Sequence, residues 1–252
     1  MNTRYSSRDS RFSVSNDAQP LSIGASQQLA MSQFISRTYG WMFIGLSLTA
    51  FVSYRLASSE AFAGYILQNR GVFMLAIFAE FGLVMALTAF FKRLSKATAT
   101  LGFLAYSALN GVTLSVIFMT YAMGTIAQVF FVTAGMFGGL ALFGTVTRKD
   151  LTGLGSFVGM GLWGLILVGF ANMFIGSESL SLGLGAAGVL IFSGLTAYYA
   201  QRIRTMAYQA TTPGAIGTIE ANKGPIFGAL MLYLNFINLF LSLLRLFGGR
   251  RR

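Results

Sequence analysis

Long apolar runs separated by short polar segments dominate the chain. Each run is close to the ~20 residues that an α-helix needs to cross the hydrocarbon core of a bilayer. Seven such segments are predicted as membrane spans, at approximately 38–57, 71–91, 99–120, 125–147, 154–175, 182–200 and 225–247. The pattern therefore predicts an all-α integral membrane protein, a bundle of seven transmembrane helices.

The first part of the chain has a different pattern. Residues 1–34 are polar and rich in serine, without sustained periodicity, so we expect a disordered N-terminal tail. Asp9, Asp17 and the lack of an apolar segment argue against a transit peptide or a secretory signal. Residues 35–252 are then predicted to form the transmembrane domain, with residues 201–224 as its one long connection.

Composition supports the membrane assignment. Hydrophobic residues make up 55% of the chain and charged residues 10%, too few to cover a water-exposed surface. The net charge of +11 is not taken as a sign of nucleic-acid binding, because membrane proteins gather Lys and Arg in cytoplasmic loops. The chain has no Cys and no His, which removes thiol chemistry and the usual sensor of neutral pH.

The positions of Lys and Arg predict the orientation. With seven spans, the tail and the second, fourth and sixth connections share one side, and most basic residues lie there. The N-terminus is therefore predicted to be cytoplasmic. The basic residues Arg250, Arg251 and Arg252 do not fit this orientation, since seven full spans place them outside the cytoplasm. The sequence leaves open whether the last segment crosses completely.

One acidic residue lies inside a predicted span. Six of the seven carboxylates belong to the tail, the loops or the loop edges, whereas Glu80 stands in the middle of the second span. A charged acid at a helix centre costs about 2.5–3.5 kcal/mol on insertion scales, so Glu80 should face the bundle interior. It is interpreted either as part of an ion or proton pathway or as a hydrogen-bonded contact between helices.

Other polar residues form stripes at helical spacing. Ser107, Asn110 and Thr113 share a face of the third span, and Asn235, Asn238 and Ser242 share a face of the last, continued by Arg245. Span six adds a stripe that ends at Tyr199. With Glu80, these stripes predict a polar seam inside the bundle, which is either a permeation path or a packing pattern.

No pattern indicates an enzyme. Metal-ligand clusters, H-E-x-x-H and G-x-S-x-G are all missing from the sequence, so no catalytic residue, bound metal or cofactor is expected. Residues 159–164 and 183–188 match G-x-G-x-x-G but do not follow a strand. Their glycines, like the spaced pairs Gly135/Gly139 and Gly155/Gly159, are interpreted as helix-packing residues.

Four stretches resemble one known family. They are AEFGLV around Glu80, TVTRKD at 145–150, FSGLTAYYAQRIR at 192–204 and LYLNFINLFLSLLRLFG at 232–248. Together they resemble the transmembrane BAX inhibitor motif family, the Bax inhibitor/YccA group, in its bacterial branch. The resemblance runs from about residue 30 to residue 250.

The resemblance implies a seven-helix bundle with the last helix in the centre. It also implies a pH-sensitive calcium leak, and for some bacterial members a link to a membrane-anchored ATP-dependent protease. Leak-type members carry a pair of aspartates, thought to share a proton, at the positions of Tyr199 and Asn235. Neither residue can reproduce that switch, because Tyr has a reference pKa of about 10 and Asn does not titrate. Glu80 matches the glutamate of the family's second span.

Two functions are consistent with these features. The first is a cation leak, for calcium, in which pH gating is altered or lost and Glu80, Asn110, Tyr199, Asn235 and Asn238 form the ion pathway or gate. The second is a non-conducting regulator that binds another membrane protein, such as a quality-control protease. A bacterial cytoplasmic membrane is the expected location.

Overall fold

The computed structural model describes residues 19–211 and 219–248, and these residues form helices without any strand. The helices are α1 (Gln19–Ala57), α2 (Glu60–Gln68), α3 (Arg70–Phe90), α4 (Lys96–Thr120), α5 (Met123–Val146), α6 (Thr152–Ile175), α7 (Glu178–Thr211) and α8 (Ile219–Phe247). Six of them, α3 to α8, are long and apolar enough to cross a membrane. The prediction of an all-α membrane protein is confirmed.

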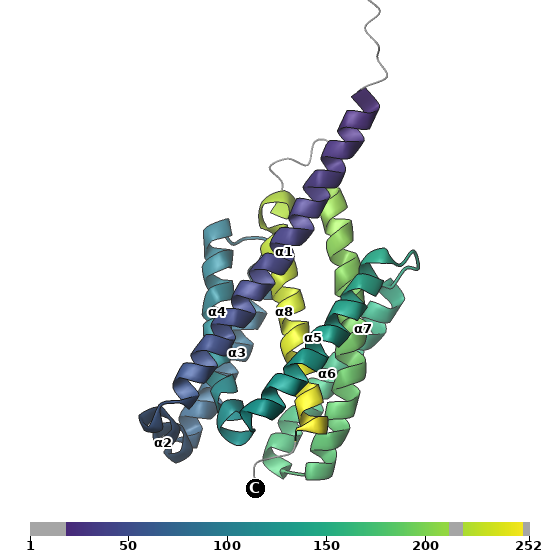
Figure 1. Ribbon diagram of the computed structural model, residues 1–252. Helices are drawn as coiled ribbons and strands as arrows, with labels where there is room; N and C mark the ends of the chain where they lie inside the picture. The colour runs from purple at the N-terminus through teal and green to yellow at the C-terminus, as the bar shows by residue number, and fades with distance from the viewer. Residues whose placement is uncertain (1–18, 212–218, 249–252) are drawn as a thin grey trace, which may run out of the picture.

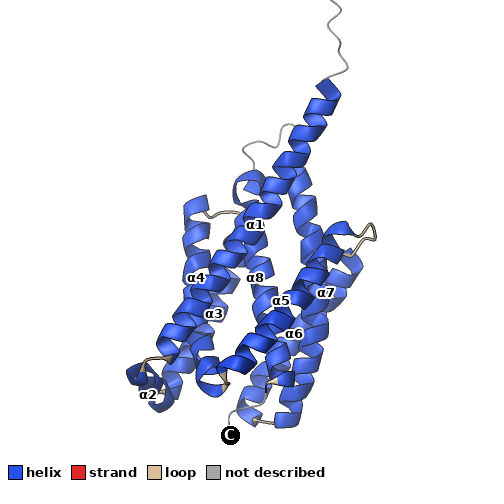
Figure 2. Cartoon of the chain, viewed as in Figure 1, coloured by secondary structure: helices blue, strands red, loops and turns tan. Residues whose placement is uncertain are grey.

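Successive long helices run in opposite directions (Figures 1 and 2). The beginning of α1, the α3–α4 and α5–α6 connections and the beginning of α8 lie at one end of the bundle, which we call the amino end. Helix α2, the α4–α5 and α6–α7 connections and the end of α8 lie at the other, which we call the α2 end.

Two predicted boundaries are wrong. Helix α1 begins at Gln19, so residues 19–34 are helical and not part of a disordered tail; residues 1–18 lie outside the described residues. Here Phe34 is buried, and its ring lies so close to Gly224 that a Cβ there would come within 2.6 Å. The long connection at 201–224 is also shorter than predicted, because α7 continues to Thr211 and α8 begins at Ile219.

Helix α8 supplies much of the buried core. Its apolar segment is 78% buried, whereas the corresponding segments of the other five candidate spans reach at most 39%. It packs against α1, α4, α5 and α7, and Leu232, Tyr233 and Leu239 on it are completely buried. Large exposed side chains such as Phe131 and Phe174 lie on the outer helices, as expected for surfaces in contact with lipid.

Glycines allow the closest helix contacts. A Cβ on Gly144 of α5 would meet the carbonyl oxygen of Ala197 on α7, and one on Gly188 of α7 would meet Ser242 on α8. The packing role predicted for the 183–188 stretch is therefore confirmed at Gly188. By contrast, Gly139 has open space around its Cα, so the predicted Gly135/Gly139 contact does not form.

A buried lysine joins α8 to the α3–α4 connection. The Lys223 ammonium donates hydrogen bonds to the carbonyl oxygens of Phe91 (3.4 Å), Lys92 (3.2 Å) and Leu94. It also lies 5.8 Å from the centre of the Phe91 ring. The carbonyls at the end of α3 carry the negative end of its dipole, so they stabilise this cation where water is scarce.

Candidate functional site

Glu80 on α3 meets a polar face of α4. Its carboxylate accepts hydrogen bonds from the Tyr106 hydroxyl (3.3 Å), the Thr113 hydroxyl (2.8 Å) and the Asn110 side-chain amide. The three donors lie on one side of α4 because residues four and seven positions apart share a helix face. Hydrogen bonds to a charged group offset part of its desolvation, which explains how an acid is accommodated here.

Asn110 has a side-chain oxygen that no described residue binds in this cluster. Its side chain is 5% exposed, and its oxygen Oδ1 has no hydrogen-bond partner among the described residues. A buried amide oxygen without a partner is costly unless a water or a cation occupies the space beside it. The pair formed by Glu80 and Asn110 thus presents oxygen atoms of the kind that hard cations prefer.

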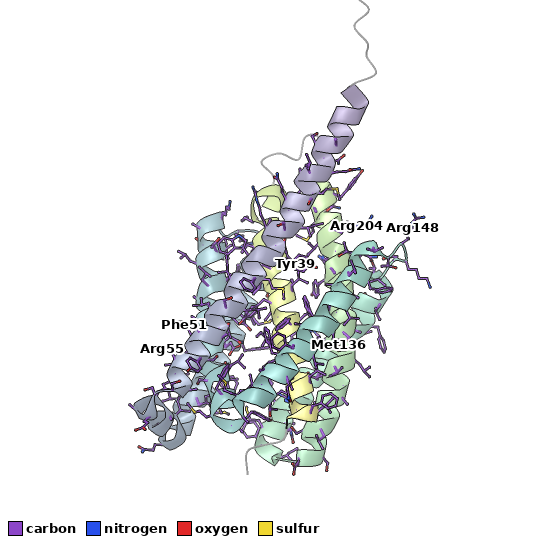
Figure 3. The ribbon with its side chains drawn as sticks, viewed as in Figure 1. Tyr39, Phe51, Arg55, Met136, Arg148 and Arg204 are labelled. Atoms are coloured by element: carbon purple, nitrogen blue, oxygen red, sulfur yellow. The ribbon has the colours of Figure 1, made fainter. Side chains whose placement is uncertain are left out.

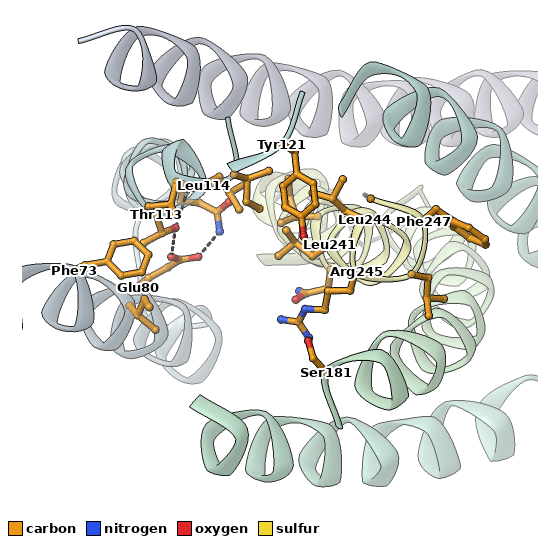
Figure 4. A pocket seen from close by; sticks show the side chains of 18 of the residues that line it. Phe73, Glu80, Thr113, Leu114, Tyr121, Ser181, Leu241, Leu244, Arg245 and Phe247 are labelled. Carbon is orange, nitrogen blue, oxygen red and sulfur yellow. Dashed lines mark hydrogen bonds between the residues drawn. The ribbon is translucent and has the colours of Figure 1, made fainter. Parts of the chain in front are cut away.

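The cluster lines a cavity of about 1210 Å³ between α3, α4, α7 and α8 (Figure 4). Tyr121, Glu178 and Phe247 also line it, and because they belong to helix termini at the α2 end, the cavity reaches that end of the bundle. In Figure 4, Glu80 lies on one side of the space and Arg245 of α8 on another, with its guanidinium directed toward Ser181. The cavity therefore contains charges of both signs.

Toward the amino end, a cluster of three buried aromatic side chains lies next to the cavity. We call Phe103, Tyr106 and Tyr233 the aromatic plug. The Tyr233 ring meets Phe103 and Tyr106 edge to face, with centroid distances of 5.7 and 5.9 Å, and all three residues are buried. Phe103 and Tyr233 each lie about one helical turn beyond the cavity-lining residues of their helices, on the side of the amino end.

A hydroxyl contact ties the plug to α1. The hydroxyls of Thr49 and Tyr233 are 2.6 Å apart, and Thr49 donates to the carbonyl oxygen of Ser107 at 2.8 Å. Because a threonine hydroxyl carries a single hydrogen, Tyr233 is the donor to Thr49. The plug is thus held by α1, α4 and α8 together.

The predicted polar seam divides into two parts. Asn238 lines the cavity with Glu80 and Asn110, whereas Asn235 and Tyr199 are not among the lining residues. The Asn235 amide is buried and donates to the Met231 carbonyl at 2.7 Å, within its own helix. The Asn238 amide likewise donates to the carbonyl of the residue four positions earlier, at 2.8 Å.

Packing of α7 on α8 fixes the level of Tyr199 relative to Asn235. The two helices run antiparallel; Gly188 packs on Ser242, and Gly228 packs on Ile203. This register places Tyr199 about one helical turn from Asn235 along the bundle axis, toward the amino end. The Tyr199 ring instead packs edge to face on Tyr198, with a centroid distance of 5.1 Å.

Several cavity residues were not singled out as site residues from the sequence. Tyr106 lies one turn before Asn110 on the same face of α4, so its spacing could have indicated it. Glu178 and Ser181 come from the start of α7, and no sequence pattern links them to Glu80. No group of three or more His, Cys, Asp or Glu side chains that could hold a metal ion occurs within residues 19–211 and 219–248.

Comparison with known proteins identifies the family. The family model described as "Inhibitor of apoptosis-promoting Bax1" matches residues 31–252. The inner membrane protein YbhL of Escherichia coli K12 is 43% identical over 88% of this chain and 93% of its own length. An uncharacterised protein of Borreliella burgdorferi is 42% identical over 88% of this chain and 94% of its own length. An uncharacterised membrane protein of Streptococcus pyogenes serotype M1 is 36% identical over 87% of this chain and 94% of its own length. The resemblance in the four sequence stretches is thereby confirmed, and the chain belongs to the Bax inhibitor family.

Proposed function

We propose that this protein spans a bacterial inner membrane seven times, with α8 in the centre and α1 as the additional span. Thr49 and Ser53 of α1 bond to the carbonyl oxygens of Ser107 and Gly111 in the middle of α4, at 2.8 and 2.9 Å. Because α4 is a candidate span, this part of α1 must lie at the same membrane depth. The exposed apolar side chain of Phe51 on α1 supports the same placement.

The distribution of charge supports a cytoplasmic amino end. Lys92, Arg93, Arg148, Lys149 and Arg204 lie in or beside the connections at that end. At the α2 end, the basic residues in the described part of the chain are Arg55, Arg70 and Arg245, and the acidic residues Glu60 and Glu178 lie there too. Lys and Arg gather on the cytoplasmic side of membrane proteins, so the cavity would open to the periplasm.

Within this arrangement the protein acts as a slow cation leak, with calcium as the proposed ion. The observation that carries the proposal is the cavity that leads from the α2 end to the Glu80 carboxylate. A carboxylate deep in a low-dielectric vestibule attracts cations more strongly than a surface acid does, and Asn110 and Asn238 add polar atoms beside it. The aromatic plug represents the closed state, and conduction requires it to separate. The proposal includes no enzymatic activity and no cofactor.

Gating by pH is proposed to be altered or lost. The family resemblance places a titrating aspartate pair where this chain has Tyr199 and Asn235. Asn235 is bonded within its own helix, and Tyr199 lies about one turn away from it along the axis. Neither side chain changes its charge between pH 6 and 8, so this pair supplies no proton switch in that range.

A non-conducting regulator that binds another membrane protein is the second candidate. Two observations favour it: the aromatic plug is closed, and Arg245 places a positive charge in the same cavity as Glu80. A guanidinium there repels cations unless it moves or pairs with an acid. A membrane-anchored quality-control protease is the kind of partner proposed in this case.

Replacing Glu80 by Gln tests the leak. The change keeps the shape of the side chain and removes the negative charge. In liposomes loaded with a calcium dye, we expect flux to fall at least about tenfold, since a charge–charge contact at ~4 Å amounts to several kcal/mol even at an effective dielectric constant of ~20. Glu60→Gln, which changes an exposed acid on α2 outside the cavity, is the matched control and should conduct like the native protein.

The outcomes separate the two candidates. No flux from the native protein above empty vesicles, while a relative with the aspartate pair conducts in parallel, would refute the leak. Recovery of a stoichiometric partner from native membranes by cross-linking would then support the regulator. Equal flux from the Glu80→Gln and Glu60→Gln variants would show that the cavity is not the pathway.

A further inference from the structure

A second cavity lies between α1 and α5, on the outside of the bundle. It has a volume of about 620 Å³, and its walls are almost entirely apolar. Ile35, Met42 and Leu46 form the α1 side, whereas Gly138 and Ala141 belong to the α5 side. The floor includes Phe236 of α8, whose ring packs against Phe137 and Phe130 of α5. We call this cavity the α1–α5 groove.

One end of the groove is polar. Tyr39 of α1 and Thr145 of α5 both line it, and the Thr145 hydroxyl donates to the Ala141 carbonyl oxygen of its own helix at 2.8 Å. Arg204 of α7 donates from its guanidinium Nη1 to the Thr145 carbonyl oxygen at 2.9 Å, so its charge is held beside this end. Figure 3 shows Tyr39 between α1 and α5, with Arg204 and Arg148 toward the amino end.

We propose that the α1–α5 groove binds one anionic phospholipid, with an acyl chain in the apolar groove and its phosphate at Arg204. This ligand matches both chemistries that meet here. A groove without charged residues excludes water-soluble anions, whereas the adjoining arginine distinguishes an acidic headgroup from a neutral one. Arg204 is exposed and carries five N–H donors, and its hydrogen bond to the Thr145 carbonyl uses one of them.

The location in the membrane also fits a lipid. Tyr39, Thr145 and Arg204 lie toward the amino end of the bundle, where we place the headgroups, and the groove continues from there along α1 and α5. Arg148 follows Thr145 by three residues, just beyond the end of α5, and is exposed, which adds a second positive charge toward the amino end. Juxtamembrane Lys and Arg residues attract anionic lipids.

Two pairs of variants test the acyl-chain site and the headgroup site separately. Gly138→Leu places a large side chain in the groove, and its Cβ has room because a Cβ at Gly138 meets nothing within 4 Å. Gly139→Leu is its matched control, since Gly139 has equal space on the same helix but does not line the groove. Arg204→Gln removes the proposed phosphate ligand, and Arg202→Gln removes an exposed arginine that instead bonds to the Tyr198 hydroxyl at 2.8 Å.

Native mass spectrometry of the delipidated full-length protein provides the measurement, with titrations of phosphatidylglycerol and phosphatidylcholine of identical acyl chains. We expect the native protein and the Gly139→Leu variant to retain one phosphatidylglycerol selectively, and Gly138→Leu to lose this binding. Arg204→Gln should reduce the preference for phosphatidylglycerol about fivefold, the effect of one basic residue near an anionic surface, whereas Arg202→Gln should not.

Three results would overturn the proposal. Equal retention by the Gly138→Leu and Gly139→Leu variants would mean that the bound lipids are only those surrounding any membrane protein. An equal preference in the Arg204→Gln and Arg202→Gln variants would remove the headgroup site. A change in oligomeric mass in Gly138→Leu, without a change in lipid binding, would make the groove an interface between copies of the chain.

Discussion

The hydroxyl of Tyr233 provides the sharpest test of how the cavity is closed. Tyr233→Phe keeps the ring and its edge-to-face contacts but removes the 2.6 Å hydrogen bond to Thr49. Side-chain hydrogen bonds between membrane helices contribute about 0.6 kcal/mol on average and about 1.7 kcal/mol at most. If the bond forms only when the aromatic plug is closed, its loss raises the ratio of open to closed protein about threefold, and about 20-fold at most.

Calcium flux into dye-loaded liposomes measures this ratio when the same amount of protein is reconstituted. Tyr198→Phe is the matched control, because it removes a hydroxyl that accepts a hydrogen bond from Arg202 at 2.8 Å, away from the plug. We expect increased flux in Tyr233→Phe and native flux in Tyr198→Phe. The reasoning is refuted if both variants conduct like the native protein, or if both increase flux equally.

Two further predictions concern packing and pH. Gly144→Ala should lower the melting temperature in detergent, because the new Cβ meets the Ala197 carbonyl and costs about 1–3 kcal/mol of stability. Gly139→Ala is the control and should leave the melting temperature unchanged, since a Cβ at Gly139 lies in open space. Equal melting temperatures of the two variants would contradict this packing. Tyr199 and Asn235 lie on the packed helices α7 and α8, about one helical turn apart along the axis. Converting both to Asp should make liposome flux depend on pH, since two carboxyls at that spacing in a low-dielectric environment disfavour each other's ionisation. The same pH profile in the native and doubly substituted proteins would show that these positions do not form the gate.

Much of the fold follows from local patterns. Apolar runs of membrane-spanning length indicate helices because each helix satisfies its own backbone hydrogen bonds in lipid. The same argument placed Glu80 toward the interior, since a charge facing lipid carries a large desolvation cost. The ends of helices were less predictable: α1 begins at Gln19 and α8 at Ile219, earlier than the apolar runs indicate. Packing such as that of Phe34 on Gly224 supports the polar turns of these helices.

The sequence by itself determined that this is a membrane protein, that Glu80 points inward and that Asn110 shares a face with polar neighbours. Only the tertiary structure decided which polar groups meet. Asn235 and Asn238 are three residues apart, yet only Asn238 lines the cavity, because the neighbouring helices differ on the two sides of α8. The aromatic plug likewise joins residues from distant parts of the chain, and spacing along one helix carries no information about its partners across the bundle.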